Sequence, residues 1–329
     1  MSTIYDVARR AGVSISTVSL ALNSPGRLKR STLDRVLAAA DELAYVPKAE
    51  AVTRARRGVG RIGVMAPFTS YPSFGRRLNG VLRATRDLPF DVVIYDQESA
   101  AVTSPSLSSI PITRQLDGLI IMALPFDDAI ARRLIQHKLP TVLLETRHAG
   151  FSSISIDDAD GGRLVAELLL RRGHTRLGSV IEQKRGQRRT LPAEERLDGF
   201  RRALAAAGHD LPDELVRQVP YGVEPSRQAA SSLFGLTEPP TAVFAYDDVL
   251  ATGVLRAARD HGLRVPEDVA VVGFDDSDLA DYLGLTTVRQ PLEESGEVAT
   301  RALLGQMSDP SASLQRITLG LSVIERSTT

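Results

Sequence analysis

Two short helices joined by a tight turn open this chain, and this pattern constrains its fold more than any other feature. Thr3 is a capping hydroxyl residue, and apolar residues at positions 4, 7, 8 and 11 then lie on one helical face. Gly12 ends this predicted helix, and Ser14 caps a second one that Asn23 closes. Such a pair around a glycine places a recognition helix in the major groove of DNA.

A third helix is expected from about Ser31 to Ala44, because apolar residues recur along one side of this stretch. Its buried side would consist of Leu33, Val36, Leu37, Ala40, Leu43 and Ala44. A generic three-helix bundle would show the same periodicity. The caps, the tight turn and the basic segment that follows together favour a DNA-binding helix-turn-helix domain over that alternative.

Charge is divided unevenly along the chain. Residues 1–61 contain eleven Lys and Arg against five Asp and Glu, whereas the remaining residues contain 29 against 35. A basic head on an acidic body presents one end to phosphates. The linker from Lys48 to Arg61 is itself basic, so we expect it to contact phosphates or the minor groove, although a solvated connector would have the same composition.

Length and composition limit which kinds of protein and of chemical site this chain can form. A chain of 329 residues exceeds one ordinary core, so two or three units are expected. The absence of Cys excludes disulfides, thiolate nucleophiles and Cys-based metal sites. We expect a cytoplasmic protein with no membrane contact, since the sequence has no long apolar run and no apolar signal region. The five His residues are scattered, so we predict no metal, no cofactor and no catalytic residue.

Beyond Arg61, short apolar strands alternate with helices, which is typical of parallel sheets covered on both faces. The expected strands are Ile62–Ala66, Asp91–Tyr95, Gly118–Ala123, Thr141–Glu145, Ser153–Asp157, Leu177–Ile181, Val216–Pro220, Ala242–Tyr246, Val269–Phe274 and Thr287–Gln290. The clearest helices are Arg163–Arg172, Glu195–Ala207, Ser226–Leu236, Val249–His261 and Glu293–Met307. Ten strands are many for one covered sheet. We therefore expect two doubly wound lobes with a cleft between them, and a ligand beyond the carboxyl ends of the strands.

Several segments in a fixed order carry a resemblance to a known family. They are TIYDVARRAGVSISTVSLALN, LAYVP, GHTRLG, ERLDGF, PTAVFAYDDVLATGVL, LRVPEDVAVVGFDD and LTTVRQP. From Thr3 to about Arg326 the chain resembles the LacI/GalR family of bacterial transcriptional repressors. The likeness implies a homodimer that binds a palindromic double-stranded DNA operator and responds to a small effector, commonly a sugar or a nucleobase.

The resemblance also implies the division of the chain. A helix-turn-helix DNA-binding domain would span residues 1–46 and a hinge 47–60. A periplasmic-binding-protein-like core would span 61–329. Its two doubly wound parallel-sheet lobes would be about 61–158 plus 291–320, and about 159–290 plus 321–329.

The likeness assigns base reading to Ile15, Ser16 and Leu20. It matches Thr17, Ser19 and Asn23 to positions that steady the recognition helix on phosphates or on the adjoining turn. Ile15 and Leu20 cannot hydrogen bond to a base edge, but they can pack on thymine methyl groups. We therefore expect an operator recognised more by thymine contact and DNA shape than by bidentate guanine contacts. The alternative is that these two side chains belong to the core of the head.

The hinge departs from the family pattern. Relatives usually carry an Arg followed two residues later by a Leu that wedges into the central minor groove, whereas this chain has Val52 and Arg54. An apolar wedge partly unstacks a base step and kinks the duplex. Arg54 would instead favour a narrow, electronegative groove without unstacking.

Four residues would line the effector cleft if the likeness holds: Phe74, Arg196, Asp247 and Asp275. Tyr221 and Gln290 are secondary candidates. The carboxylates accept hydrogen bonds from adjacent hydroxyls, Arg196 donates a planar fork, and the aromatic rings offer stacking faces. This mixture favours a neutral, hydroxyl-rich effector, with a sugar or polyol first and a nucleoside second.

Structural alternatives exist for most of these residues. Asp248 and Asp276, and Asp247 as well, could be helix caps, which is the commonest use of Asp after a strand. Arg196 could form a surface ion pair with Asp198 or Glu195. The cluster of Asp157, Asp158 and Asp160 is interpreted as capping, with a possible role in the cleft.

The competing functional class is a sugar-binding or sugar-processing protein without a regulatory role. Two carboxylates such as Asp247 and Asp275 suggest glycoside chemistry, which needs an acid and a base flanking the bond. Nothing nearby in the sequence supplies the rest of such a site, and the DNA-binding head would have no purpose. We therefore predict a regulator rather than an enzyme.

Overall fold

The computed structural model describes residues 2–45, 58–97, 107, 109–110, 112, 115–124, 127–183 and 192–329. The chain folds into two compact units. Unit 1 is Met1–Ser155 with Leu292–Ile317, and unit 2 is Ile156–Pro291 with Thr318–Thr329. The chain therefore passes from one unit to the other three times. Within the described ranges, no helix is long and apolar enough to cross a membrane.

Three helices form the N-terminal head: α1 (Ile4–Ala11), α2 (Ile15–Asn23) and α3 (Arg30–Glu42). Thr3 caps α1 through a reciprocal pair of hydrogen bonds with Asp6, and Gly12 ends the helix at a φ of 64°. Ser14 caps α2 by accepting a hydrogen bond from the N–H of Thr17 at 3.2 Å. The predicted caps and turn are confirmed.

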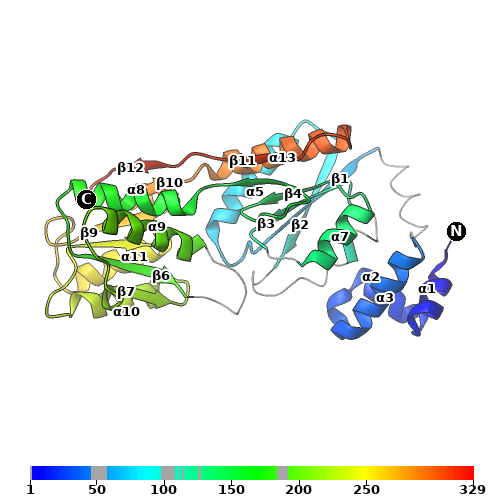
Figure 1. Ribbon diagram of the computed structural model, residues 1–329, viewed down its shortest axis with the longest axis horizontal. Helices are drawn as coiled ribbons and strands as arrows, with labels where there is room; N and C mark the ends of the chain where they lie inside the picture. Colours follow the sequence, from blue (N-terminus) through cyan, green and yellow to red (C-terminus); the bar gives the residue numbers. More distant parts are fainter. Residues whose placement is uncertain are drawn as a thin grey trace. The chain divides into compact units, whose positions relative to one another are not determined.

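The head has an apolar core of side chains from all three helices, which lie together in blue in Figure 1. This core includes Val7, Ala8, Val18, Ala21, Leu22, Leu33, Val36, Leu37 and Ala40. The prediction for Ala44 is wrong. Helix α3 ends at Glu42, and Ala44 follows it in an exposed position with a φ of 45°.

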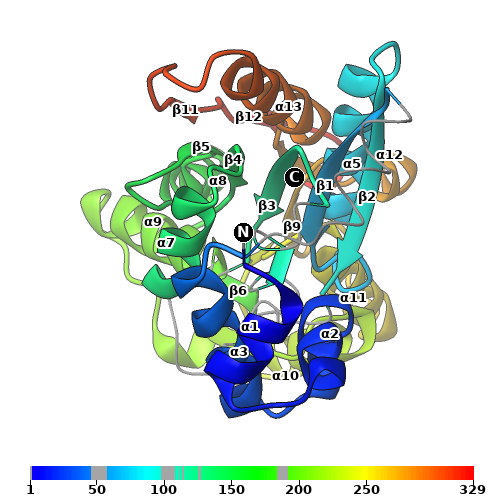
Figure 2. The same cartoon turned by 90° about the vertical axis from the view of Figure 1, so that its right-hand side faces the viewer.

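The sheet of unit 1 has the strand order β11-β5-β4-β3-β1-β2. Its strands are β1 (Gly60–Ala66), β2 (Phe90–Asp96), β3 (Gly118–Met122), β4 (Thr141–Leu144), β5 (Ser152–Ser155) and β11 (Arg316–Thr318). β1 pairs in parallel with both β2 and β3, and Figure 2 shows β1 beside β2. The helices α5 (Pro72–Thr85), α7 (Asp128–Gln136) and α13 (Leu292–Ser308) also belong to this unit. β3 and β4 are buried along their whole length, as their unbroken apolar runs predict.

The sheet of unit 2 has the strand order β12-β10-β9-β8-β6-β7. Its strands are β6 (Leu177–Glu182), β7 (Val216–Val219), β8 (Ala242–Ala245), β9 (Ala270–Phe274), β10 (Thr286–Arg289) and β12 (Ser322–Ile324). Its helices are α8 (Asp158–Arg171), α9 (Pro192–Ala206), α10 (Val223–Phe234), α11 (Asp248–Asp260) and α12 (Asp278–Leu283). β12 is antiparallel to β10, whereas the pairs among β6 to β10 are parallel. The predicted fold class, a helical head with two doubly wound α/β lobes, is confirmed.

Glycines allow helices in both units to approach each other very closely. In unit 2, a Cβ added at Gly162 of α8 would lie 1.9 Å from the carbonyl oxygen of Arg196 on α9. In unit 1, a Cβ at Gly296 of α13 would lie 2.0 Å from the carbonyl oxygen of Arg77 on α5. No other residue type fits at these two positions without moving a backbone.

Each of the ten predicted strands overlaps an observed one. The two that the sequence pattern did not predict are β11 and β12, which are three residues long and lie near the C-terminus. β11 has two exposed residues of three and β12 has one, and both strands are too short to show a period.

Candidate functional site

The first candidate site is the outer side of α2. Ile15 is 39% exposed and Leu20 is half-buried. The buried residues of this helix are Val18, Ala21 and Leu22. The alternative that Ile15 is a core residue is therefore wrong, and Leu20 is only partly covered.

Polar side chains of α2 are joined by hydrogen bonds. The hydroxyl of Ser14 lies 2.8 Å from the hydroxyl of Ser16 and 2.8 Å from that of Thr17. The Asn23 amide donates to the carbonyl oxygen of Ser19 at 3.0 Å. These bonds order the polar side chains along the exposed surface of the helix, where they could meet phosphates or base edges.

The second candidate site lies in unit 2, at the carboxyl ends of three neighbouring parallel strands. Asp247 follows β8, Asp275 follows β9 and Gln290 follows β10. The Gln290 amide donates a hydrogen bond to the Asp275 carboxylate. The structure thus brings these two predicted site residues together at the edge where doubly wound sheets bind ligands.

Arg196 reaches this edge from α9 and is only 4% exposed. Its Nε donates to Asp158 Oδ1 at 2.8 Å, and its Nη1 donates to the carbonyl oxygen of Tyr246 at 2.7 Å. Its guanidinium also lies 3.6 Å from the centre of the Phe274 ring and 4.7 Å from that of Tyr246. Burial opposes the charged form, but the neighbouring groups Asp158, Tyr246 and Asp275, with Asp158 first among them, together raise the pKa of Arg196. Arg196 is therefore a fixed cation held between a carboxylate and two aromatic faces.

Asp247 caps a helix and also belongs to this site. Its carboxylate accepts a hydrogen bond from the N–H of Leu250 at 2.8 Å, which caps α11, and another from the Tyr221 hydroxyl. Burial, and then the negative charge of Asp275, raise the pKa of Asp247 above its ordinary range. Burial, and then the Asp247 carboxylate, raise the pKa of Tyr221, which keeps its hydroxyl as a donor.

Tyr246, Phe274 and Glu182 were not predicted as site residues, whereas Asp158 belongs to the acidic cluster for which a role in the cleft was considered beside capping. Asp158, Tyr246 and Phe274 surround Arg196, and Glu182, buried at the end of β6, acts electrostatically on Tyr246. Glu182 could have been found, because it directly follows the predicted strand Leu177–Ile181 and ends the observed β6. The partnership of Asp158 with Arg196 has no signal in the sequence, since 38 positions separate the two residues.

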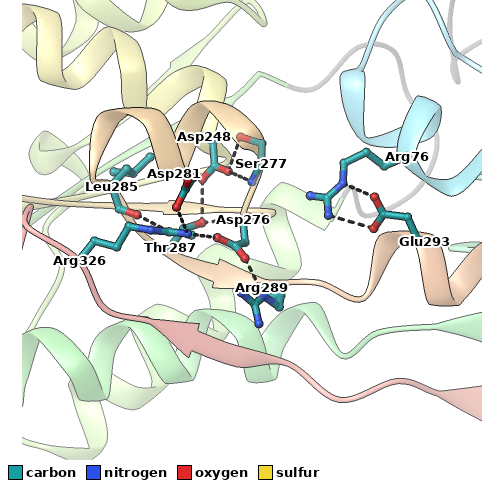
Figure 3. Close-up of polar contacts among 10 residues, drawn as sticks. All are labelled: Arg76, Asp248, Asp276, Ser277, Asp281, Leu285, Thr287, Arg289, Glu293 and Arg326. Atoms are coloured by element: carbon teal, nitrogen blue, oxygen red, sulfur yellow. Dashed lines mark hydrogen bonds and ion pairs between the residues drawn. The ribbon is translucent and has the colours of Figure 1, made fainter. Parts of the chain in front are cut away.

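Two predicted caps are wrong. Asp248 is the first residue of α11 rather than its cap, and its carboxylate accepts hydrogen bonds from Ser277 and Thr287 (Figure 3). Asp276 is bound by two arginines, while Ser277 caps α12. In α11 the preceding residue, Asp247, takes the capping position, whereas the β9–α12 loop is one residue longer than the β8–α11 loop, so that Ser277 caps α12.

The acidic cluster before α8 divides into separate roles. Asp157 caps α8 by accepting from the N–H of Asp160, which confirms a capping role. Asp158 binds Arg196, so the surface ion pair considered for that arginine is wrong. Asp160 pairs with Arg163 on the surface.

Phe74 belongs to unit 1, on α5, and is 6% exposed. Tyr71 meets it edge-on with ring centres 6.0 Å apart, and the Arg77 guanidinium lies 5.3 Å from its centre. Phe74 is therefore largely covered within its own unit. The hinge predictions for Val52 and Arg54 fall outside the described residues.

The polar groups of the unit 2 site can make hydrogen bonds to a bound molecule. Across the part of the chain that the structure describes, no three His, Asp or Glu side chains group as a metal site. Carboxylate acceptors, a tyrosine hydroxyl and an arginine guanidinium can make hydrogen bonds to several neighbouring hydroxyl groups.

Comparisons with known proteins agree with this description. Residues 3–48 match the family described as bacterial regulatory proteins, lacI family, and residues 166–329 match a periplasmic binding protein-like domain. The chain is 30% identical to the HTH-type transcriptional regulator DegA of Bacillus subtilis, over 100% of this chain and 98% of that protein. It is also 30% identical to the ribose operon repressor of Escherichia coli, over 99% of each chain. Among solved structures, the transcriptional regulator CelR–cellobiose complex is 27% identical, with a TM-score of 0.71 over 100% of both chains.

Proposed function

Because the chain belongs to the lacI family of bacterial regulatory proteins, we propose that α2 reads a palindromic operator and that a sugar or polyol bound at the Arg196 site of unit 2 controls operator affinity. The relatives are transcriptional regulators, so the predicted DNA-binding regulator is confirmed over the enzyme alternative. We propose in addition the class of effector, the residues that contact DNA and effector, and a homodimeric assembly.

The observation that carries the proposed effector role is the convergence of Arg196, Asp275, Asp247, Tyr221 and Gln290 at one strand edge. Its donors and acceptors suit adjacent hydroxyl groups, and the aromatic faces of Tyr246 and Tyr221 suit the apolar side of a sugar ring. A ribose operon repressor among the relatives and a cellobiose complex among the similar structures favour a sugar over a nucleoside.

A gel-shift titration tests this function directly. The full chain should retard a labelled fragment of the neighbouring promoter, and the retardation should weaken at higher salt as counterion release requires. A panel of ribose, galactose, cellobiose and sorbitol should contain a compound that changes the operator affinity and raises the unfolding temperature. Sugar turnover without DNA affinity would instead support the enzyme alternative.

Effector and operator should influence each other reciprocally. We propose that the effector changes operator affinity through a coupling free energy of about 1–3 kcal/mol. The operator then changes effector affinity by the same factor. We further propose that the protein acts in the cytoplasm, where its operator lies.

The thymine contact of α2 can be tested by removing one methyl group from the DNA. Replacing the contacted thymine by uracil should weaken operator binding by about fourfold, since a buried methyl contributes about 0.8 kcal/mol. In the Leu20→Ala variant the same replacement should have almost no effect, because the methyl has lost its partner. Ser16→Ala is the comparison on this helix: it removes a hydroxyl and leaves Leu20 in place, so replacing thymine by uracil should still weaken binding by about fourfold. An equal loss for wild type and Leu20→Ala would contradict the assignment of Leu20.

The hinge is proposed to bind without an apolar wedge. Arg54 stands where relatives carry the wedging Leu, and its guanidinium suits the negative potential of a narrow minor groove. The proposal therefore predicts a preference for A·T-rich sequence at the centre of the operator.

A homodimer is proposed because both units expose large apolar side chains. Leu82, Leu88 and Ile94 are exposed on unit 1, and Leu279 and Tyr282 on unit 2, where Tyr282 is 87% exposed. Ile94 lies on β2, one of the two edge strands of the unit 1 sheet.

Ile94→Lys is therefore expected to shift the protein from dimer to monomer in sedimentation equilibrium and to weaken operator binding. Ile135→Lys is a matched control, because Ile135 on α7 has the same exposed fraction of 51%. Wild-type protein that sediments as a monomer at micromolar concentration would contradict the dimer proposal.

A further inference from the structure

The turn that carries Asp275 has an unusual backbone. Asp275 has a φ of 106° and Asp276 has a φ of 51°, although neither is a glycine. Asp is tolerated near 50°, but a residue with a Cβ at 106° is strained. Contacts with the surrounding structure must therefore stabilise the turn. The hydrogen bonds of the Asp275, Asp276 and Ser277 N–H groups are among these contacts.

Each of the three backbone N–H groups of this turn donates a hydrogen bond to a residue outside the turn. The Asp275 N–H donates to the carbonyl oxygen of Val288 at 2.8 Å, and the Asp276 N–H donates to Thr287 Oγ1 at 3.3 Å. The Ser277 N–H donates to Asp248 Oδ2 at 2.7 Å. Two of these partners come from β10 and one from the start of α11.

The carboxylate of Asp276 is held by two arginines (Figure 3). Arg289 Nε donates to Oδ2 at 2.6 Å, and Arg326 Nη2 donates to Oδ1 at 2.7 Å. Burial opposes ionisation, but Arg326 and Arg289 hold the pKa of Asp276 below its ordinary value. The side chain of Asp276 is only 9% exposed, so this pairing is screened less than a surface ion pair.

Arg326 is itself fixed in the C-terminal segment (Thr318–Thr329). Its Nη1 donates to the carbonyl oxygen of Leu285 at 2.9 Å, and its own N–H donates to Thr286 Oγ1 at 2.9 Å. Two residues further, Thr328 Oγ1 donates to the carbonyl oxygen of Val271 at 2.7 Å. The C-terminal segment is thereby attached to β9 and β10, the two strands that flank the turn.

We propose that Asp276 and Arg326 are positioning residues for effector recognition. By binding each other they hold Asp275 in its strained conformation, so that its carboxylate points to the site. This inference rests on the proposed function, because Asp275 is the residue that would contact the effector. It adds that effector affinity depends on a contact with a residue 50 positions away, in the C-terminal segment.

The test compares Arg326→Gln and Asp276→Asn with wild type. Asn tolerates a positive φ, so Asp276→Asn removes the negative charge while the backbone at this position can still adopt the conformation of the turn. Arg172→Gln is the matched control, because Arg172 binds Glu325 of the same segment at an exposed position. Arg326→Lys keeps a charge without the planar fork and should fall between Arg326→Gln and wild type.

Two measurements decide the outcome. Hydrogen exchange of the Asp275, Asp276 and Ser277 amides should be about tenfold faster in Arg326→Gln and Asp276→Asn, and unchanged in Arg172→Gln. Calorimetry with the compound of the ribose, galactose, cellobiose and sorbitol panel that binds wild type most tightly should show about tenfold weaker binding. Operator affinity without that compound should stay at the wild-type level.

The possible failures can be told apart. If wild type binds none of the four compounds, the proposed effector class is wrong and this inference falls with it. If wild type binds one of them and the two variants bind it equally well, the positioning role is wrong while the proposed function stands. Unchanged exchange of the three amides would likewise overturn the positioning role.

Discussion

Replacing Arg196 by methionine is expected to weaken effector binding about 100-fold and to abolish the effector response in a gel shift. The reason is that charge-assisted hydrogen bonds contribute about 1.5–3 kcal/mol each, and Arg196 is the buried cation of the site. The variant also leaves Asp158 buried without its partner, and breaking a buried ion pair costs about 3–5 kcal/mol of stability. Operator binding without effector should persist at temperatures where unit 2 remains folded.

Two controls separate recognition from stability. Arg202→Met changes an arginine on the same helix, which is 66% exposed and paired with Asp198 at 2.9 Å, and its expected cost is only about 0.3–0.5 kcal/mol. The double variant Arg196→Met with Asp158→Leu removes the buried charge and should regain stability without regaining effector affinity. A double variant that responded to the effector as wild type does would contradict the role of Arg196.

Replacing Gly296 by alanine is expected to destabilise unit 1 by about 1–3 kcal/mol or more. The added Cβ would lie 2.0 Å from the carbonyl oxygen of Arg77 and 3.1 Å from the backbone nitrogen of Val81. Both neighbours are backbone atoms, so relief requires α5 and α13 to move apart as whole helices. Urea unfolding followed by far-ultraviolet circular dichroism measures the change, since the chain contains no Trp.

Gly305→Ala is the matched control on the same helix. Nothing lies within 4 Å of a Cβ added at Gly305, so alanine there should stabilise α13 by about 0.5–1 kcal/mol through its higher helix propensity. The two substitutions make the same chemical change and should have opposite signs. Equal effects at the two positions would contradict the close helix contact.

The fold could be predicted from the sequence wherever local signals and tertiary packing agree. Thr3, Gly12 and Ser14 define the helices of the head, and unbroken apolar runs define β3 and β4. The strands β11 and β12 could not be predicted, because they form only by pairing with strands remote in the sequence. The end of α3 was misplaced by two residues, since the apolar side chains continue beyond the last helical turn.

For the candidate site, the sequence predicted several of the residues but not the contacts between them. The likeness to the family suggested Asp247, Asp275 and Gln290, and the predicted strands supported the two Asp residues, because parallel strands place their carboxyl ends on one edge. What could not be predicted was the set of contacts that fix these side chains, such as Asp158 with Arg196 and Asp276 with Arg326. These pairs are decided by three-dimensional packing. In the sequence, an Asp near the start of a helix shows the same pattern whether it caps the helix or binds a distant arginine.

The three passages of the chain between the units have a consequence for synthesis on the ribosome. Unit 1 lacks α13 and β11 until residue 317 has been added, and unit 2 lacks β12 until the last few residues. At about 5–20 residues per second, the head is synthesised roughly 15–55 s before residue 317. A nascent chain therefore displays its DNA-binding end well before either sensory lobe is complete, and a prematurely terminated product would retain a DNA reader that no metabolite could control.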